Sequence, residues 1–302
     1  MPGSHALRRE RLRPAIAASG ADAALITTLI NVRYLTGLAS SNAALLLPAD
    51  GPPVLATDSR YALAAERDCP DVELLNARPV EAALAELGAA RGLGRLAFEA
   101  QEMTVERHAA LATTEGVALL VPLGHAVEQL RVTKDDEELA LLARACEITG
   151  QAFDQAVTRI RAGMTEHELA VLIERAMVDA GAEKPAFDTI VASGPNGAIP
   201  HHAPGSRCLE PGDMITIDCG ARYGGYHADM TRTVMLGQPA SWPSPRAAAS
   251  SARAVSTGRA FSSSTSGQSR AAASAYRESV ASTAGPSAGT SSAALELARP
   301  VR

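Results

Sequence analysis

The chain has 302 residues, of which 46% are hydrophobic and only 3% aromatic, and its formal net charge at pH 7 is −5. This length leaves room for two domains with cores of Leu, Val, Ile and Ala, and the acidic balance argues against nucleic acid as a partner. The sequence has no apolar run of 18 residues, so no membrane helix is expected. The four cysteines are scattered and are expected to be free thiols. Together with an N-terminus that lacks an apolar leader-like segment, they predict a cytoplasmic protein.

The first 125 residues alternate between helix and strand signals. Short apolar runs bounded by turn residues predict strands, and the longer segments between them predict helices. We therefore expect a layered α/β domain over residues 1–125, without the Gly-rich loop that nucleotide binding would need. The expected helices are Leu7–Ser19, Ser59–Asp68, Val80–Arg91 and Thr104–Thr113, and the expected strands are Ala23–Thr28, Ala43–Pro48, Pro53–Thr57, Val72–Asn76, Arg95–Glu99 and Val117–Val121.

The periodicity changes after residue 131. A 3.6-residue apolar pattern predicts a long helix over Asp135–Arg161. Thr165 and Glu168 have the spacing of a capping box, so a second helix is expected to begin at Thr165 and to end at Gly181. Residues 131–240 are therefore expected to form an α+β domain. Its strands are expected at Phe187–Ala192, Met214–Cys219 and Tyr226–Leu236.

Two aspartates lie in the arms of an expected β-hairpin. If the chain turns between Tyr223 and Gly224, Asp218 lies opposite Asp229, with Cβ atoms about 4.5–5.5 Å apart. Two carboxylates at that separation repel each other unless a proton or a cation lies between them, so the pair predicts a divalent-metal site, in particular a site for two ions. The alternative is an ordinary pair of turn aspartates, because a one-residue bulge would separate them.

Two histidines, His201 and His202, follow a loop rich in Gly, Pro and Asn, where functional side chains are often placed. An imidazole beside a metal site could support an oxyanion or hold a substrate group. The alternative is a solvated loop histidine. His227 has the same parity as Asp229, but a local bulge would decide its direction, so it is not included among the expected ligands.

Five segments occur in a characteristic order: Asn31–Gly37, Arg131–Glu138, Phe187–Asn196, Pro200–His202 and Glu210–Thr233. Together they resemble the aminopeptidase P/prolidase family, the pita-bread metallopeptidases that also include creatinase and the methionine aminopeptidases. The resemblance covers residues 1 to about 240. It implies a creatinase-type N-terminal α/β domain over residues 1–125, followed over residues 131–240 by part of a pita-bread α+β domain.

The resemblance also implies a function, which is metal-dependent hydrolysis of the bond before proline in Xaa-Pro peptides. It assigns Asp218 as the first carboxylate ligand of a two-metal site and Asp229 as the carboxylate that bridges both ions, with manganese or cobalt expected and zinc a further candidate. His201 matches the catalytic histidine that contacts substrate, and His202 is expected to help in substrate binding. A homodimer is expected through the N-terminal domain.

The chain departs from the family after the second aspartate. The family adds a histidine and two glutamates as further ligands, whereas the sequence from Trp242 onward has no histidine and only Glu278 and Glu296 as acids. Two aspartates alone are expected to bind a divalent ion weakly. Two alternatives to an active peptidase therefore stay open: an inactive truncated protein or a binding module built on the N-terminal domain, and a creatinase-like hydrolase.

The composition changes at about residue 241. Residues 241–302 contain 16 Ser and 16 Ala, with 7 Arg and 2 Glu. Such a segment buries too little apolar surface to offset its chain entropy, so disorder is expected. We hypothesise an out-of-frame reading of a GC-rich gene, which translation of the other two frames would test; an interaction segment is the alternative.

Overall fold

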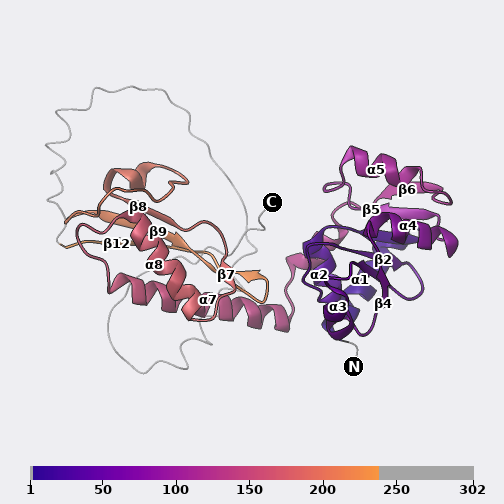
Figure 1. Ribbon diagram of the computed structural model, residues 1–302, viewed down its shortest axis with the longest axis horizontal. Helices are drawn as coiled ribbons and strands as arrows, with labels where there is room; N and C mark the ends of the chain where they lie inside the picture. Colours follow the sequence, from indigo (N-terminus) through magenta and orange to yellow (C-terminus); the bar gives the residue numbers. More distant parts are fainter. Residues whose placement is uncertain (1–2, 238–302) are drawn as a thin grey trace, which may run out of the picture. The chain divides into compact units, whose positions relative to one another are not determined.

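The protein is described by a computed structural model over residues 3–237; residues 1–2 and 238–302, and with them the tail expected to be disordered, lie outside this description. The chain divides into two compact units, Met1–Leu139 and Ala140–Arg302 (Figure 1). None of the helices within residues 3–237 combines the length and the apolar character needed to span a membrane.

The first unit is built on a six-stranded mixed sheet. The strand order is β4-β3-β2-β1-β5-β6, with β1 antiparallel to β2 and parallel to β5. Its elements are α1 (Ser4–Ala18), β1 (Ala23–Ile26), α2 (Leu29–Thr36), β2 (Ala43–Pro48), β3 (Val54–Thr57), α3 (Ala62–Asp68), β4 (Glu73–Asn76), α4 (Val80–Ala90), β5 (Arg95–Phe98), α5 (Val105–Ala112), β6 (Leu119–Pro122) and α6 (Ala126–Val132).

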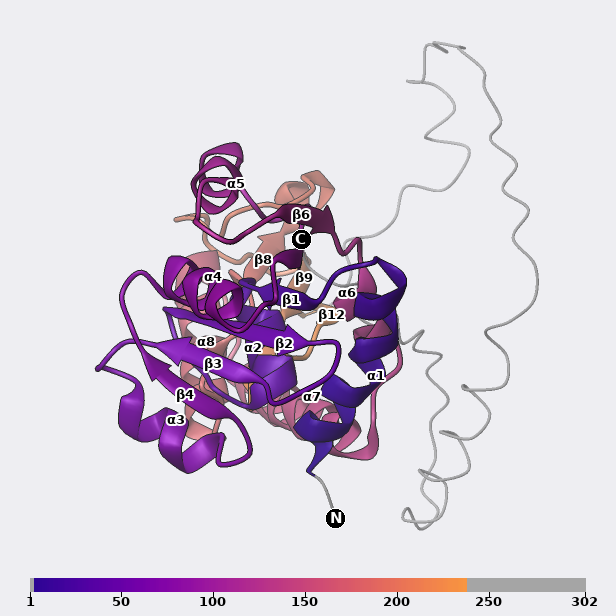
Figure 2. The same cartoon turned by 90° about the vertical axis from the view of Figure 1, so that its right-hand side faces the viewer.

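Helices cover both faces of this sheet, which explains why β1 and β2 are apolar throughout and buried at every position. Ile26 and Leu45 face a core shared with α1, α2 and α6. Leu25 and Leu46 face the opposite core, shared with α4 and α5. Figure 2 shows α4 beside β2 and β3 on one face and α1 on the other. The expected layered α/β arrangement is confirmed.

The second unit combines two long helices with short antiparallel strands. One small sheet has the order β12-β9-β8 and the other has the order β11-β10-β7. The elements are α7 (Asp136–Val157, which begins at the end of the first unit), α8 (Glu166–Asp179), β7 (Lys184–Pro185), β8 (Ile190–Ser193), the 3-10 helix η1 (Gly194–Ala198), β9 (Met214–Cys219), β10 (Ala221–Tyr223), β11 (Tyr226–His227) and β12 (Met230–Met235).

The β12-β9-β8 sheet has one core face and one open face. Ile215, Ile217 and Cys219 of β9 are fully buried and pack with apolar residues of α7 and α8. We call the opposite side the open face, because its side chains are half-buried or exposed in the described part of the chain. Its members are Met214, Thr216 and Asp218 of β9 and Thr231, Thr233 and Met235 of β12. η1 contacts β8 and β9 on the side away from α7 (Figure 1).

The motif segment Asn31–Gly37, for which no element was predicted, is mostly helix, since α2 spans Leu29–Thr36 and ends at Gly37, whose φ of 91° is left-handed. Two expectations about single elements are wrong. β8 begins at Ile190 instead of Phe187. The expected strand Tyr226–Leu236 is interrupted between β11 and β12. α6 was not expected at all.

Candidate active site

The register of the β9–β12 hairpin differs from the expected one. Thr231, not Asp229, lies opposite Asp218. The chain turns at Gly224 and Gly225, whose φ values of 56° and 81° suit a two-residue turn that joins Tyr223 to Tyr226. The predicted direct opposition of the two aspartates is therefore wrong by two residues.

A two-residue shift leaves the parity of the two aspartates unchanged, because side chains alternate with a period of two along a strand. Asp218 is half-buried on the open face and hydrogen-bonds with Thr231, whose hydroxyl donates to Oδ1 at 2.9 Å. Asp229 is exposed and directly precedes β12, whose alternate residues Thr231 and Thr233 are also exposed. If the register of β9 and β12 continues by one residue, Asp229 is expected at a diagonal position to Asp218, at about 7–8 Å.

The charges of both aspartates act on one buried thiol. The pKa of Cys219 is raised to about 12, first by burial and then by the negative charges of Asp218 and Asp229, with Arg232 opposing them. Cys219 lies on the core side of β9, directly after Asp218. The two carboxylates therefore belong to one electrostatic neighbourhood, which a cation bound between them would neutralise.

A close approach of two backbone segments holds the arms together. The amide of Ala228 donates to the carbonyl of Ala221 at 3.0 Å. At Gly220 a Cβ atom would lie 1.9 Å from the carbonyl oxygen of Ala228 and 3.0 Å from Cε1 of Phe187. Only glycine fits at this crossing, which lies between Asp218 and Asp229 in the chain.

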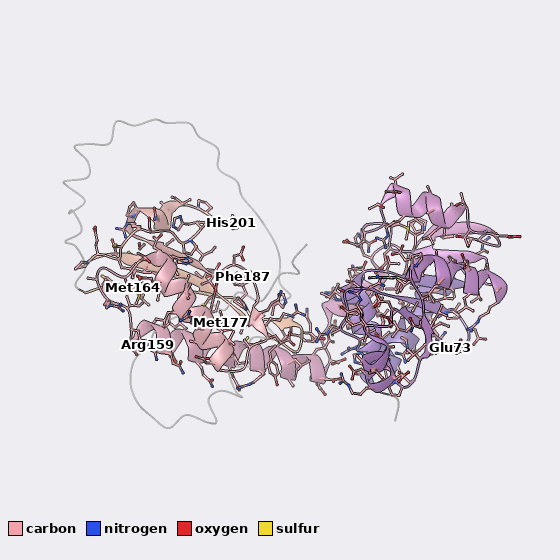
Figure 3. The ribbon with its side chains drawn as sticks, viewed as in Figure 1. Glu73, Arg159, Met164, Met177, Phe187 and His201 are labelled. Carbon is pink, nitrogen blue, oxygen red and sulfur yellow. The ribbon has the colours of Figure 1, made fainter. Side chains whose placement is uncertain are left out.

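The histidine loop joins β8 to β9 and presents its two histidines differently. His201 is exposed and has a φ of 54°, the only positive φ of a non-glycine residue within residues 3–237. His202 is half-buried, and its Nε2 lies 2.8 Å from Oε2 of Glu166. In Figure 3, His201 and Arg159 lie on opposite sides of the second unit. His227 lies in β11 opposite Arg222, and its pKa is lowered by burial and by the positive charges of Arg222 and Lys184.

Glu166 is a member of this region that the sequence reasoning missed. Its side chain is fully buried at the first turn of α8, and it accepts hydrogen bonds from Ser193, Asn196, His202 and Gly205. Burial alone would raise its pKa, but these hydrogen bonds outweigh burial and lower the pKa to about 2. The capping box of Thr165 and Glu168 forms as expected and places Glu166 at the start of α8. This predicted helix start was the signal in the sequence that could have drawn attention to Glu166.

The described residues do not form a complete metal site. Within residues 3–237 no group of three or more His, Cys, Asp or Glu side chains is arranged to hold an ion. Divalent ions such as Mg²⁺ and Ca²⁺ take about six or more oxygen ligands. Asp218 and Asp229 therefore do not form a complete donor set by themselves.

Two family models match the chain. The metallopeptidase family M24 matches residues 140–259, and the creatinase/prolidase N-terminal domain matches residues 8–133. An uncharacterized peptidase, YqhT, of Bacillus subtilis is 35% identical over 234 residues, covering 77% of this chain and 66% of that protein. The Xaa-Pro dipeptidase of Pyrococcus furiosus is 43% identical over 113 residues, covering 37% of this chain and 32% of that protein.

A solved structure shows the same two-part architecture. The Xaa-Pro dipeptidase from Bacillus anthracis matches with a TM-score of 0.74 and 31% identity, covering 78% of this chain and 66% of that one. The chain thus covers about 66% of the length of the two relatives that it matches over both units. The matches confirm a creatinase-type α/β unit followed by part of a pita-bread domain.

Proposed function

The chain belongs to metallopeptidase family M24, and we propose that its reaction is hydrolysis of the peptide bond before proline, with an Xaa-Pro dipeptide or a short Xaa-Pro peptide as substrate. The observation that supports the proposal is that Asp218 lies on the open face of β9, while Asp229 directly precedes the paired strand β12 with the same parity as Thr231. Relatives named as Xaa-Pro dipeptidases favour a peptide substrate over creatine.

The proposed roles follow from the chemistry of each side chain. Asp218 and Asp229 offer carboxylate oxygens to divalent ions, for which we propose manganese or cobalt, with zinc as a further candidate. His201, exposed at the tip of its loop, supports the developing negative charge on the substrate carbonyl oxygen. The ring of His202 is held by Glu166. His202 therefore contributes to substrate binding indirectly, by fixing the shape of the loop.

The test is proline release from Ala-Pro by the purified 302-residue chain in the presence of Mn²⁺. The proposal expects release above a metal-free blank, and expects it to vanish in Asp218→Asn and in Asp229→Asn. A matched control is Asp154→Asn, an exposed carboxylate of α7 in the same unit, on the helix that packs against the core face of the sheet. No release above the blank from the folded wild-type chain refutes the activity.

A second candidate is a protein without catalytic activity. The incomplete donor set within residues 3–237 favours it, together with the absence of any histidine after His227 in the sequence. Calorimetric titration with Mn²⁺ separates the two candidates. Tight binding of two ions per chain contradicts the second candidate, whereas binding only in the millimolar range supports it.

We also propose a homodimer formed through the first unit and a cytoplasmic location, the latter because all four cysteines are free thiols. Light scattering after gel filtration of the purified chain tests the dimer. A mass equal to one chain, about 31 kDa, contradicts it.

A further inference from the structure

The carboxylate of Glu166 joins the two limbs of the histidine loop. On the limb before the histidines, Oε1 accepts from the amide of Ser193 at 2.8 Å, from its hydroxyl at 2.7 Å and from Nδ2 of Asn196 at 3.0 Å. On the limb after them, Oε2 lies 2.8 Å from Nε2 of His202 and accepts from the amide of Gly205 at 3.3 Å. Each oxygen thus serves mainly one limb, and His201 lies between the limbs.

The backbone of the same loop is attached to the start of α8. The amide of Glu166 donates to the carbonyl of Arg207 at 3.0 Å, and the amide of His167 donates to the carbonyl of Gly205 at 3.1 Å. Arg207 in turn donates to the Ser193 hydroxyl and to Asp213. The loop is therefore braced by the first turn of the helix, and the carboxylate lies at the centre of the brace.

A fully buried carboxylate is costly unless hydrogen bonds compensate for its desolvation, and here donors from both limbs do so. The left-handed backbone of His201 is also unfavourable for a residue with a side chain, and it persists only where the surrounding structure holds it. The neighbouring His202 ring, fixed by Glu166, is such a constraint.

We propose that Glu166 is a positioning residue for His201, whose carboxylate fixes the orientation of this exposed imidazole by holding both limbs of the loop. The inference rests on the proposed function for the role of His201 in catalysis. The fixed geometry of the loop is a property of the chain that can be measured without turnover.

The test compares Glu166→Gln with Glu168→Gln. The first substitution keeps the size of the side chain but replaces one acceptor oxygen by an NH₂ group, which faces donors instead of accepting from them. Glu168 lies in the same helical turn and is exposed, so Glu168→Gln is the matched control. We expect amide hydrogen exchange of residues 193–205 to accelerate at least about tenfold in Glu166→Gln only, with residues 169–179 unchanged.

The orientation of His201 is read separately, from its imidazole carbon signal in ¹³C-histidine NMR. We expect one sharp signal in the wild type and in Glu168→Gln, and a shifted or broadened signal in Glu166→Gln, with partial recovery in Glu166→Asp. In a preparation that hydrolyses Ala-Pro, we expect kcat to fall at least about tenfold, with a smaller rise in KM because the ring of His202 is released as well. Lack of turnover in the wild type counts against the proposed function and leaves the exchange and NMR tests intact.

Asn196→Ala provides a second variant in case Glu166→Gln does not fold. Asn196 is half-buried and holds one limb only, so a smaller acceleration confined to residues 193–205 is expected. If either folded variant keeps the wild-type exchange rates and the wild-type His201 signal, the proposal is overturned.

Discussion

Gly220→Ala is expected to separate the two arms that carry Asp218 and Asp229. The added methyl group would lie 1.9 Å from the carbonyl oxygen of Ala228, and a gap of at least 3.0 Å is needed, so the backbone must move by roughly 1.1 Å (3.0 − 1.9). Overpacking of this kind costs typically about 1–3 kcal/mol, and the upper end applies because the obstacle is a backbone atom. We therefore expect a loss of about 3 kcal/mol in the local stability of the hairpin.

The matched control is Gly150→Ala in α7. A Cβ atom at Gly150 meets nothing within 4 Å, so the same substitution should stabilise the helix by about 0.5–1 kcal/mol. Amide hydrogen exchange of β9 and β12 measures the local opening free energy, which suits a chain of two units better than a single denaturation midpoint. Unchanged protection of β9 in Gly220→Ala would show that the crossing at Gly220 tolerates a methyl group.

Three further predictions concern other parts of the chain. Glu166 has its pKa lowered from 4.5 to about 2, so its stabilising effect is complete above the unfolded value and is lost as the pH falls. The difference in unfolding free energy between wild type and Glu166→Gln should shrink by roughly 3 kcal/mol from about pH 6 to about pH 2 in urea titrations; a constant difference contradicts this. Leu25→Ala, at a fully buried position, should lower the free energy of unfolding by about 2–5 kcal/mol. Leu63→Ala, at a position 82% exposed, should change it by less than about 0.5 kcal/mol. Equal losses in thermal unfolding would overturn the assignment of the core. Gly194→Ala places a Cβ atom 2.6 Å from Oδ1 of Asp213 at a φ of 51°, so exchange of residues 193–205 should accelerate by about tenfold or more, and wild-type exchange rates would contradict it.

Local signals in the sequence predicted most of the secondary structure. The apolar runs of β1 and β2 and the capping box at Thr165 identified elements that the structure contains. The turn of the β9–β12 hairpin was misplaced because its register depends on which two residues adopt positive φ. In Tyr223-Gly224-Gly225-Tyr226 those are the two glycines.

Glu166 could not be predicted for a different reason. Its donors at Ser193, Asn196, His202 and Gly205 are 27 to 39 residues away in the chain, and no local pattern shows that they converge on one carboxylate. The equal parity of Asp218 and Asp229 along the two arms can be read from the sequence, and a shared side stays a prediction from it. Their separation was not predictable, since it depends on the register.

If Asp218 and Asp229 bind one cation, bound Mn²⁺ should broaden the amide NMR signals of both residues. We expect substoichiometric Mn²⁺ to broaden the signals of Asp218, Asp229 and Thr231 first, and we expect Asp218→Asn to abolish the effect. The exposed acidic residues Asp136 and Glu137 at the start of α7 serve as the internal control. Earlier broadening at these control residues, or broadening near Asp229 that persists in Asp218→Asn, would show that the two aspartates do not share an ion.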